Sequence, residues 1–443
     1  MSAPIMVETV DTFLQFLAGL SAWEFLAYFW PFLLIDFNRY IVVDGIGIVQ
    51  YLYGHVTQND DREDARRQLY REYPLVTVII PGKDEGSTLE SLVETLHQQT
   101  YANLEIIVVD DGSEDRTPEI GRRLEDEGRI DRFLRQRVRG GKASAANTGL
   151  RLANGQFVVH IDADSYLRDD AIEKSLLPFY AEENVGAVGG DIRVANASRN
   201  LTTLVQALEY LKTITVGRTA STEYGMLRIV AGAFGTFRTD TLRRLGGWDV
   251  GPGLDGDLTL KVRKLGLKVV HAPDAVCYTN VPTSLSALAR QRYRWSRSLV
   301  RFRLRKHSNL LRLLGPFSWS DMATVADNVL FMIILDLKWL VYIIQLIVLD
   351  VGLIPFILTV NLILYTGSNV IKYGLIKAVL AVTGTKEPSR GVGLAIPLMS
   401  WYFGFYLRTV RSLGYIMEAL FRVSYWDPWN PWKVGKEALK EGV

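Results

Sequence analysis

The sequence has a single cysteine among its 443 residues, Cys277. One cysteine excludes an internal disulfide and a zinc site built on several cysteines. The chain also has almost no net charge: 50 Lys and Arg residues against 48 Asp and Glu residues give +2. This balance argues against a dedicated nucleic-acid-binding protein. Cys277 lies in KVVHAPDAVCY, a pattern that predicts a strand, so we interpret it as a small buried side chain and not as a nucleophile.

Two common nucleotide-binding signatures are missing as well. No GxxxxGK[ST] loop occurs, which excludes a P-loop ATPase, and no GxGxxG follows the first predicted strand, which counts against a dinucleotide-binding fold. The N-terminus has no positively charged segment leading to a cleavage site, so a removed signal peptide is not expected.

Long apolar runs are confined to the two ends of the chain. Residues 328–349 can cross a hydrocarbon core, which takes about 20 apolar residues. Residues 353–371 and 392–407 are weaker candidate spans. Residues 21–54 predict one long or tilted span, broken near Pro31, and the segment before it predicts an amphipathic surface helix or a short span. We therefore expect a multi-pass protein of the inner (plasma) membrane.

Lysine and arginine placement predicts the orientation of these spans. The linker at 372–390 is basic, so the positive-inside rule places it in the cytosol together with the central domain. Three late spans would put the basic tail on the opposite side, so the number of spans stays open. Asp336 and Lys338 lie inside an apolar run. They predict either an ion pair between packed helices or the lining of a hydrophilic path.

The central region reads as an α/β domain. Three Val- and Ile-rich runs, at 75–82, 104–109 and 156–161, each lead through a turn into an amphipathic segment. Strands buried on both faces and alternating with helices predict a parallel sheet.

Each of these strands ends in acidic residues. Parallel sheets bind ligands at the carboxyl ends of their strands, so the acids are expected to converge on one edge. Gathered carboxylates need a positive charge between them, which a divalent cation with oxygen ligands supplies. A cation held by few carboxylates commonly bridges phosphates, which favours a nucleotide diphosphate ligand. The alternative is helix capping by Asp110 or Ser113. The acids are Asp84 and Glu85, Asp110 and Asp111, and Asp162 and Asp164.

A basic segment, LARQRYRWSRSLVRFRLRKHS at 288–308, contains no acid. On a helix, Gln291, Arg294 and Trp295 are spaced three and four residues apart and share one face. Arg294 can bind a diphosphate through two parallel hydrogen bonds, and Trp295 offers a flat aromatic face. The alternative is an interfacial helix with no catalytic part.

The motifs VVDDGS, DAD, VAGAFGTFR, GGWD, LDGD and QRYRW occur in one order along the chain. With this set the sequence resembles the membrane-embedded, processive family 2 glycosyltransferases, which make cellulose, chitin, hyaluronan and poly-N-acetylglucosamine. The resemblance implies a Rossmann-like α/β domain of the GT-A type, cytosolic, with flanking transmembrane and interfacial helices. The expected division is an N-terminal region at 1–73, the GT-A domain at 74–283, interfacial helices at 284–320 and a C-terminal transmembrane region and tail at 321–443.

The resemblance also implies a donor site. Asp111 matches the position that holds uridine, and Glu85 matches a residue near the base. Asp164 matches the ligand of Mg²⁺ or Mn²⁺, with Asp162 beside the metal and the ribose or diphosphate. Lys142 matches a lysine near the donor, for which a solvated lysine is the alternative. Gln291 and Arg294 complete the donor-binding set.

The general base is implied at Asp255, where relatives have the Asp of a TED-like motif. Asp257 is the second candidate. Leu254 stands where the family usually has an acid, and Lys83 where relatives often have an aromatic residue. A helix cap is the alternative role for Asp255.

The acceptor site is implied at Trp295 and at Gly232 and Ala233, whose small size permits close approach of a sugar. Trp248 is expected to pack near the acceptor or in the core. The remaining arginines of the basic segment are expected to contact anionic lipid headgroups. They include Arg297, Arg301, Arg303 and Arg305.

We expect an inverting synthase that transfers a sugar from a UDP-sugar to a growing β-linked polysaccharide and passes the polymer through its own spans. UDP-N-acetylglucosamine is the first expected donor and UDP-glucose the second. The expected partners are the donor, the oligo- or polysaccharide acceptor, membrane lipid and an accessory membrane or periplasmic subunit, with no nucleic acid. The alternatives are transfer of one sugar to a lipid carrier and a non-catalytic, synthase-like scaffold.

Overall fold

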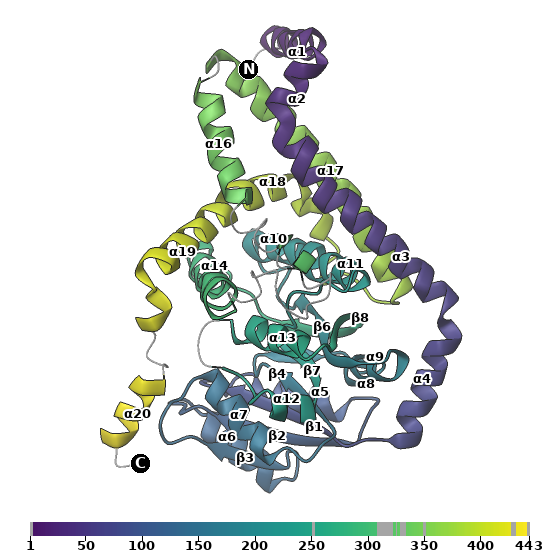
Figure 1. Ribbon diagram of the computed structural model, residues 1–443, viewed down its shortest axis with the longest axis vertical. Helices are drawn as coiled ribbons and strands as arrows, with labels where there is room; N and C mark the ends of the chain where they lie inside the picture. The colour runs from purple at the N-terminus through teal and green to yellow at the C-terminus, as the bar shows by residue number, and fades with distance from the viewer. Residues whose placement is uncertain are drawn as a thin grey trace.

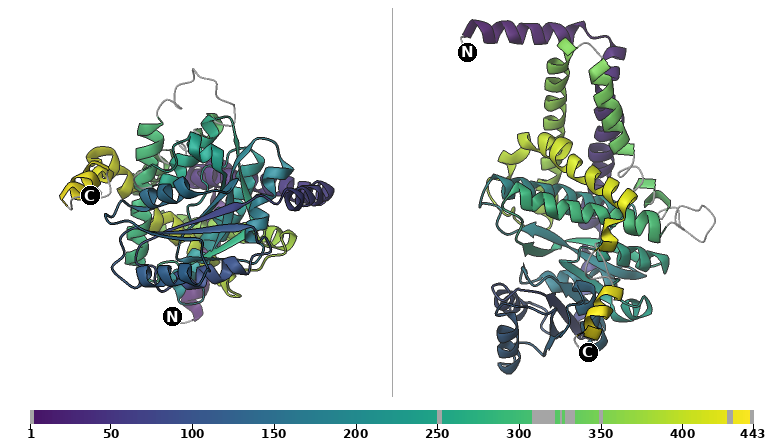
Figure 2. Two further views of the ribbon diagram at one scale, coloured as in Figure 1. Left: turned by 90° about the horizontal axis from the view of Figure 1, so that it is seen from below. Right: turned by 90° about the vertical axis from the view of Figure 1, so that its left-hand side faces the viewer.

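The chain forms an eight-stranded sheet domain, and helices from both ends of the sequence project together from one side of it (Figure 1). The computed structural model describes residues 3–249, 253–307, 322–324, 326–327, 334–348, 351–426 and 431–440. Helices cover both faces of the twisted sheet (Figure 2).

The sheet has the strand order β3-β2-β1-β4-β7-β6-β8-β5. Its first half, β3 to β4, is parallel, as the three acid-tipped runs predicted. The second half is mixed, because β7 is antiparallel to both β4 and β6, and β5 is antiparallel to β8. A parallel sheet throughout was therefore a wrong expectation. The strands are β1 (Val76–Gly82), β2 (Leu104–Asp110), β3 (Arg132–Arg135), β4 (Phe157–Ile161), β5 (Ser165–Leu167), β6 (Val185–Val194), β7 (Phe234–Arg238) and β8 (Lys268–Thr279).

Helices fill the connections of the domain. The amphipathic segments predicted after the first two runs form helices that begin at Leu89 and Thr117. The domain helices are α5 (Leu89–His97), α6 (Thr117–Asp126), α7 (Lys142–Leu152), α8 (Ala171–Leu176), α9 (Pro178–Ala181), α10 (Leu201–Tyr210), the π-helix η3 (Leu211–Val216), α11 (Gly217–Glu223), α12 (Thr239–Arg244), α13 (Leu254–Lys264), α14 (Leu285–Ser298) and the π-helix η4 (Leu299–Lys306).

The N-terminal region is helical almost throughout. Residues 22–57 form one continuous rod that runs alongside α17 (Figure 1). Pro31 does not break this rod. It cannot donate to the Ala27 carbonyl four residues earlier, and that oxygen accepts a hydrogen bond from Gln345 at 2.8 Å instead. The elements are α1 (Ala3–Gly19), α2 (Ala22–Trp30), η1 (Pro31–Asp36), η2 (Asn38–Val43), α3 (Asp44–Thr57) and α4 (Asn59–Glu72).

The C-terminal region contributes two further long helices to this projection. Among the described residues, α17 (Ile354–Val382) is the one helix long and apolar enough to cross a membrane. It contains the predicted span at 353–371 apart from its first residue. α16 (Leu335–Val348) lies within the predicted span at 328–349, whose residues 328–333 and 349 fall outside the described residues. η7 (Val351–Leu353) joins the two helices.

Residues 392–407 do not form the third late span. They fold as the short segments η8 (Val392–Leu398), α18 (Met399–Trp401) and η9 (Tyr402–Leu407). Several of their side chains, including Met399 and Tyr402, are buried in the same core cluster as the sheet domain. Pro397 interrupts regular helix here, and apolar side chains that suggested a lipid contact are used for packing. The chain ends in α19 (Arg408–Phe421), η10 (Val423–Trp426) and α20 (Pro431–Lys440).

The charges inside the projecting helices are paired. Lys338 donates to Asp36 at 2.6 Å, and Tyr365 donates to the same carboxylate. Asp336 accepts from Arg408 at 2.7 Å and from the Ser412 hydroxyl at 2.9 Å. Of the two predictions for Asp336 and Lys338, the structure therefore favours ion pairs between packed helices.

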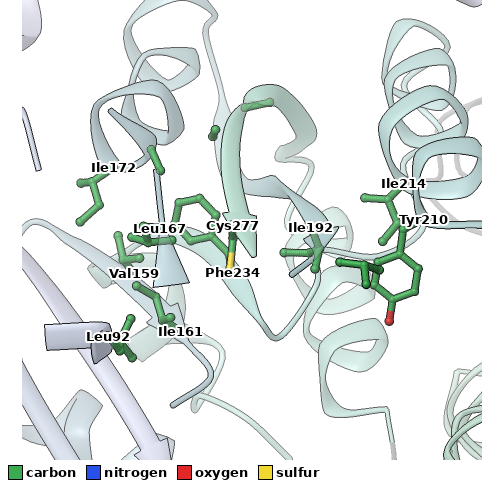
Figure 3. Close-up of a cluster of buried hydrophobic side chains, with 14 of the residues drawn as sticks. Leu92, Val159, Ile161, Leu167, Ile172, Ile192, Tyr210, Ile214, Phe234 and Cys277 are labelled. Atoms are coloured by element: carbon green, nitrogen blue, oxygen red, sulfur yellow. The ribbon is translucent and has the colours of Figure 1, made fainter. Parts of the chain in front are cut away.

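The core lies between the sheet and its helices. Phe234 and Cys277 lie at its centre, with Ile192 on one side and Val159 and Leu167 on the other (Figure 3). Cys277 is fully buried, and burial raises the pKa of its thiol. This agrees with a packing role and not with a nucleophile.

Candidate active site at the strand ends

The acid-tipped strands meet on one edge of the sheet. Because β2, β1 and β4 are adjacent and parallel, the segments that follow Asp110, Gly82 and Ile161 lie together. Asp84 does not join the site. It adopts a positive φ of 61°, and its carboxylate accepts a hydrogen bond from the Glu114 backbone N–H at 2.8 Å. Asp84 thus organises the loop, and Glu85 is left to face the other acids.

Asp111 is buried and holds the loop before α7. Its carboxylate accepts hydrogen bonds from the backbone N–H groups of Gly140 at 2.8 Å and Gly141 at 2.9 Å. Burial raises the pKa of Asp111, and these backbone bonds oppose the shift. The side chain therefore shapes the wall that leads to Lys142. Its contact with uridine stays a prediction.

Lys142 lies among the carboxylates and is not a solvated lysine. It forms an ion pair with Asp162, and its Nζ donates to the Gly232 carbonyl oxygen at 3.4 Å. Burial opposes its charge, but Asp162, Asp255 and Asp164 outweigh burial and raise the pKa of Lys142. Part of the positive charge that the gathered acids require is thus supplied by the chain itself.

Asp162 and Asp164 are positioned by the end of β4. Burial, and then the neighbouring Asp162, raise the pKa of Asp164 to about 6. No group of three or more His, Cys, Asp or Glu side chains able to hold a metal occurs within the described ranges. Two carboxylates at one strand end fit a cation whose remaining ligands are phosphate oxygens and water, as is usual for Mg²⁺. The assignment of a metal to Asp164 and Asp162 stays a prediction.

Glu85 lies near these acids, and this position disfavours its ionised form. Burial, and then the charge of Asp164, raise the pKa of Glu85 to about 7. The Thr88 hydroxyl donates to Glu85 Oε2 at 3.2 Å and offsets only part of this shift. Perturbed carboxyl groups of this kind cluster at binding and catalytic sites, which favours a binding role for Glu85.

We expect Glu85→Gln to raise the apparent melting temperature near pH 8. The folded-state pKa lies above the ordinary value, so the folded chain holds a proton that the unfolded chain releases between about pH 4.5 and 7. Stability therefore falls as pH rises through this window, and Gln removes the loss. The gain is of the order of 1 kcal/mol after allowance for partial exposure.

Thermal melts in detergent near pH 8 and near pH 4.5 check this expectation. The exposed Glu183 provides the control variant Glu183→Gln, which should change neither melt. A lower melting temperature for Glu85→Gln near pH 8 would show that Glu85 stabilises the fold.

Asp255 and Asp257 of α13 have different environments. Gly253 caps this helix without a side-chain hydrogen bond, so Asp255 is not a helix cap. Asp255 Oδ1 is buried and has no hydrogen-bond partner in the described part of the chain. Asp257 is fully buried and is used by other groups, because it accepts from Lys306 at 2.8 Å and His307 at 2.7 Å. Asp255 is thus the carboxylate that can accept a proton.

Burial raises the pKa of Asp255, and the nearby charge of Lys142 opposes the shift. Gly232 is packed directly against this carboxylate. A Cβ placed on Gly232 would lie 2.3 Å from Asp255 Oδ1. The glycine predicted to permit approach of a sugar therefore makes room for the candidate base.

We expect Gly232→Ala to lower transfer activity by about 100-fold, because a displacement of about 1 Å at a reacting group has an effect of this size. Gly256→Ala is the matched control. A Cβ there would meet Ile229 at an ordinary 3.7 Å, and alanine favours the helix. Initial rates and melting temperatures of both variants test the expectation. Equal activity of the two variants would mean that Asp255 needs no such clearance.

The QRYRW helix lies beside the helix of the base. A Cβ on Gly253 would come within 2.2 Å of Ser298 Cβ at the end of α14, so the two helices touch. Gln291 Oε1 is buried without a hydrogen-bond partner among the described residues. Arg294 is exposed, and Trp295 is 45% exposed. Arg294 and Trp295 are thus accessible to a ligand, whereas Gln291 Oε1 is covered.

Three other arginines of the basic segment are partly or wholly buried within the protein. Arg297 is buried, Arg301 donates to a backbone carbonyl of η10 at 3.3 Å, and Arg305 pairs with Glu418 of α19 at 2.9 Å. The side chain of Arg303 lies outside the described residues. For Arg301 and Arg305 the C-terminal helices fold back and supply acceptors that the local sequence does not contain. Contact of the segment with lipid stays a prediction.

Trp248 and Ala233 have different outcomes. Trp248 is 3% exposed and exchanges two hydrogen bonds with Asn147, at 2.8 and 2.9 Å. Its ring centroid lies 5.1 Å from that of His160. Of the two expectations for Trp248, the structure therefore favours packing in the core over contact with an acceptor. The Ala233 carbonyl accepts from the Asp162 N–H at 3.3 Å, so the backbone there supports the acid-tipped strand.

Sequence reasoning missed a set of residues around this site. His160 is buried beneath Lys142, and burial lowers its pKa to about 4, which keeps it neutral beside the lysine. Arg292 lies inside the QRYRW motif and is buried. The motif predicted roles for Gln291, Arg294 and Trp295 but none for Arg292. Arg292 donates to Glu209, and Tyr402 donates to the same carboxylate. No sequence pattern indicates these two partners, because they come from distant segments of the chain.

Comparison with known proteins agrees with this geometry. Residues 77–246 match the family model described as Glycosyl transferase family 2. This part of the chain is therefore a family 2 glycosyltransferase domain, as the motifs indicated. The mannosyltransferase PcManGT from Pyrobaculum calidifontis, solved in complex with GDP-Man and Mn²⁺, shares the fold with a TM-score of 0.54 at 20% identity. The alignment covers 86% of this chain and 99% of that one. The domain has the GT-A type of fold.

The similar curated proteins are polysaccharide synthases. Poly-beta-1,6-N-acetyl-D-glucosamine synthase from Staphylococcus epidermidis is 27% identical over 223 residues, which is 50% of this chain and 53% of that protein. The same synthase from Staphylococcus aureus (strain COL) is 28% identical over the same shares. The chain thus spans about half the length of the curated relatives that it matches.

Proposed function

We propose that the chain is a metal-dependent, inverting glycosyltransferase that transfers a sugar from a UDP-sugar to a growing β-linked polysaccharide at the cytosolic face of a membrane. The observation that carries the proposal is the partly exposed Asp255 carboxylate, whose Oδ1 is buried. It lies beside Lys142 and Gly232, two residues after Gly253, which contacts the end of the QRYRW helix at Ser298. Of the two candidate bases on α13, Asp257 is engaged by Lys306 and His307, which leaves Asp255.

The geometry supports a direct displacement. Asp255 removes the proton from the acceptor hydroxyl while that oxygen bonds to the anomeric carbon, and the bond from this carbon to the diphosphate breaks. Its raised pKa makes it a stronger base than an exposed aspartate. Arg294 and Lys142 supply positive charge for the diphosphate. Asp164 and Asp162 would hold Mg²⁺ or Mn²⁺, which neutralises the same leaving group.

The donor proposal follows the relatives. The matched curated proteins are named as N-acetylglucosamine polymer synthases, so UDP-N-acetylglucosamine is the first donor and UDP-glucose the second. GDP-mannose belongs in any screen, because a protein of the same fold was solved with it.

The membrane proposal rests on the projecting helices. α17 and α16 expose many large apolar side chains, among them Leu340, Ile347 and Ile363. Two passes by these helices leave the basic tail on the same side as the domain, which removes the conflict with the positive-inside rule. Asp336 and Lys338 are occupied by partners within the chain, so they do not supply the lining of a polymer path.

A donor screen in detergent or membranes tests the proposal. We expect nucleotide release with UDP-N-acetylglucosamine and Mn²⁺, together with a labelled product that grows in size. Product confined to the organic phase would favour transfer to a lipid carrier. Release from none of the UDP- and GDP-sugars would favour the non-catalytic scaffold.

A further inference from the structure

A buried ion pair joins the QRYRW helix to two other parts of the chain. Arg292 of α14 donates to Oε2 of Glu209 in α10 at 2.9 Å, and the same oxygen accepts the hydroxyl of Tyr402 in η9 at 2.6 Å. The two charged side chains are 4% and 6% exposed. α10 belongs to the sheet domain and η9 to the C-terminal region, so the cluster connects three segments that are distant in sequence.

The same arginine lies against the candidate acceptor residue. The guanidinium of Arg292 is 4.2 Å from the ring centroid of Trp295. A cation over the face of a tryptophan is attracted to the ring, and here it occupies one of the two faces. The ring is nevertheless 45% exposed, so its other face is presented to a ligand.

The orientation of Trp295 therefore depends on Arg292, and that of Arg292 depends on Glu209. An arginine with this many rotatable bonds has no fixed position without a partner. A buried charge is also costly unless a paired group and hydrogen bonds compensate it. Glu209 supplies the countercharge, and Tyr402 fixes the carboxylate that supplies it.

We propose that Arg292, Glu209 and Tyr402 are positioning residues that hold the Trp295 indole with its free face toward the acceptor sugar. The inference rests on the proposed function, because it deepens the acceptor role of Trp295. It also gives the C-terminal region a part in acceptor binding, although Tyr402 lies far outside the residues 77–246 that match the family model.

A role in folding alone is the competing explanation, and the chain contains a matched control for it. Arg305 donates to Glu418 of α19 at 2.9 Å, and the Ser424 hydroxyl donates to the same carboxylate oxygen at 2.7 Å. Glu418 is fully buried. This second cluster also joins the basic segment to the C-terminal helices, but its described contacts do not include Trp295.

The test compares Glu209→Gln, Tyr402→Phe and the control Glu418→Gln in the full chain. UDP-N-acetylglucosamine is the donor and a soluble N-acetylglucosamine oligomer the acceptor. Transfer to the oligomer is measured beside donor hydrolysis without an acceptor. For Glu209→Gln we expect an acceptor KM about tenfold higher and a transfer-to-hydrolysis ratio about tenfold lower, with an unchanged donor KM. Tyr402→Phe should shift the ratio in the same direction by about threefold.

Glu418→Gln should lower the melting temperature and leave the ratio unchanged. An unchanged ratio in folded Glu209→Gln, or parallel loss of transfer and hydrolysis, would overturn the positioning role. If Glu209→Gln does not fold, an unchanged ratio in Tyr402→Phe decides against it. Absence of transfer by the wild-type chain with any donor or acceptor would instead overturn the proposed function.

Discussion

Asp255→Asn is expected to lose transfer activity by about 10²- to 10⁴-fold, the usual contribution of a general base. Asparagine has nearly the shape of aspartate but cannot accept the proton of the acceptor hydroxyl. Asp255 Oδ1 has no hydrogen-bond partner among the described residues, so the substitution breaks no such contact at that atom. The melting temperature should therefore change little or rise slightly, since a buried charge is removed. Initial rates with labelled donor and thermal melts measure the two effects.

Asp257→Asn is the control, and the opposite pattern is expected. Asp257 is fully buried and binds Lys306 and His307, so loss of its charge should lower stability by about 1.5 to 3 kcal/mol. Transfer measured well below the melting temperature should largely persist. If Asp257→Asn abolished transfer without loss of stability, the base would have to be reassigned.

Removal of the metal is the second large effect. Exhaustive chelation with EDTA should abolish transfer, and Mn²⁺ or Mg²⁺ should restore it. Asp164→Asn should weaken binding of Mn²⁺ with UDP by at least about 10- to 100-fold, since changes even to groups outside the ligand set reach that size. Titration calorimetry of Mn²⁺ into protein with UDP measures this directly and does not require turnover.

The exposed Asp169, five residues after Asp164, provides the control variant Asp169→Asn. It leaves both carboxylates of the DAD motif intact and should bind Mn²⁺ as the wild type does. Full transfer after chelation would contradict the metal assignment. It would leave Lys142, already among the acids, as the cation that serves the diphosphate.

Local patterns predicted the first half of the sheet and the residues at its edge. Strands β1, β2 and β4 were recognisable because each is a continuous apolar run that ends in acids. The placement of Glu85, Asp111 and Asp164 follows from those strands. β5 and β7 were missed because they are short and carry no such run.

Longer-range features misled the same reasoning. Residues 392–407 are apolar enough to suggest a span, but they pack on the domain because α10 offers them a buried surface. Trp248 was open to two interpretations, and the hydrogen bonds from Asn147 place it in the core. In both cases the sequence shows that a side chain is apolar but not whether it contacts lipid, a ligand or the protein core.

The sequence by itself determined which chemistry the chain carries: acids after strands, a base at the start of a helix, and a Gln/Arg/Trp face. These are local patterns, and spacing along one element fixes them. Only the tertiary structure distinguished Asp255 from Asp257 by their partners, and showed which arginines pair within the chain. These outcomes depend on partners such as His307, Glu209 and Glu418, which folding brings in from distant segments. A carboxylate acts as a base or as an anchor according to the groups packed around it, and burial and charge pairing are properties of the folded chain.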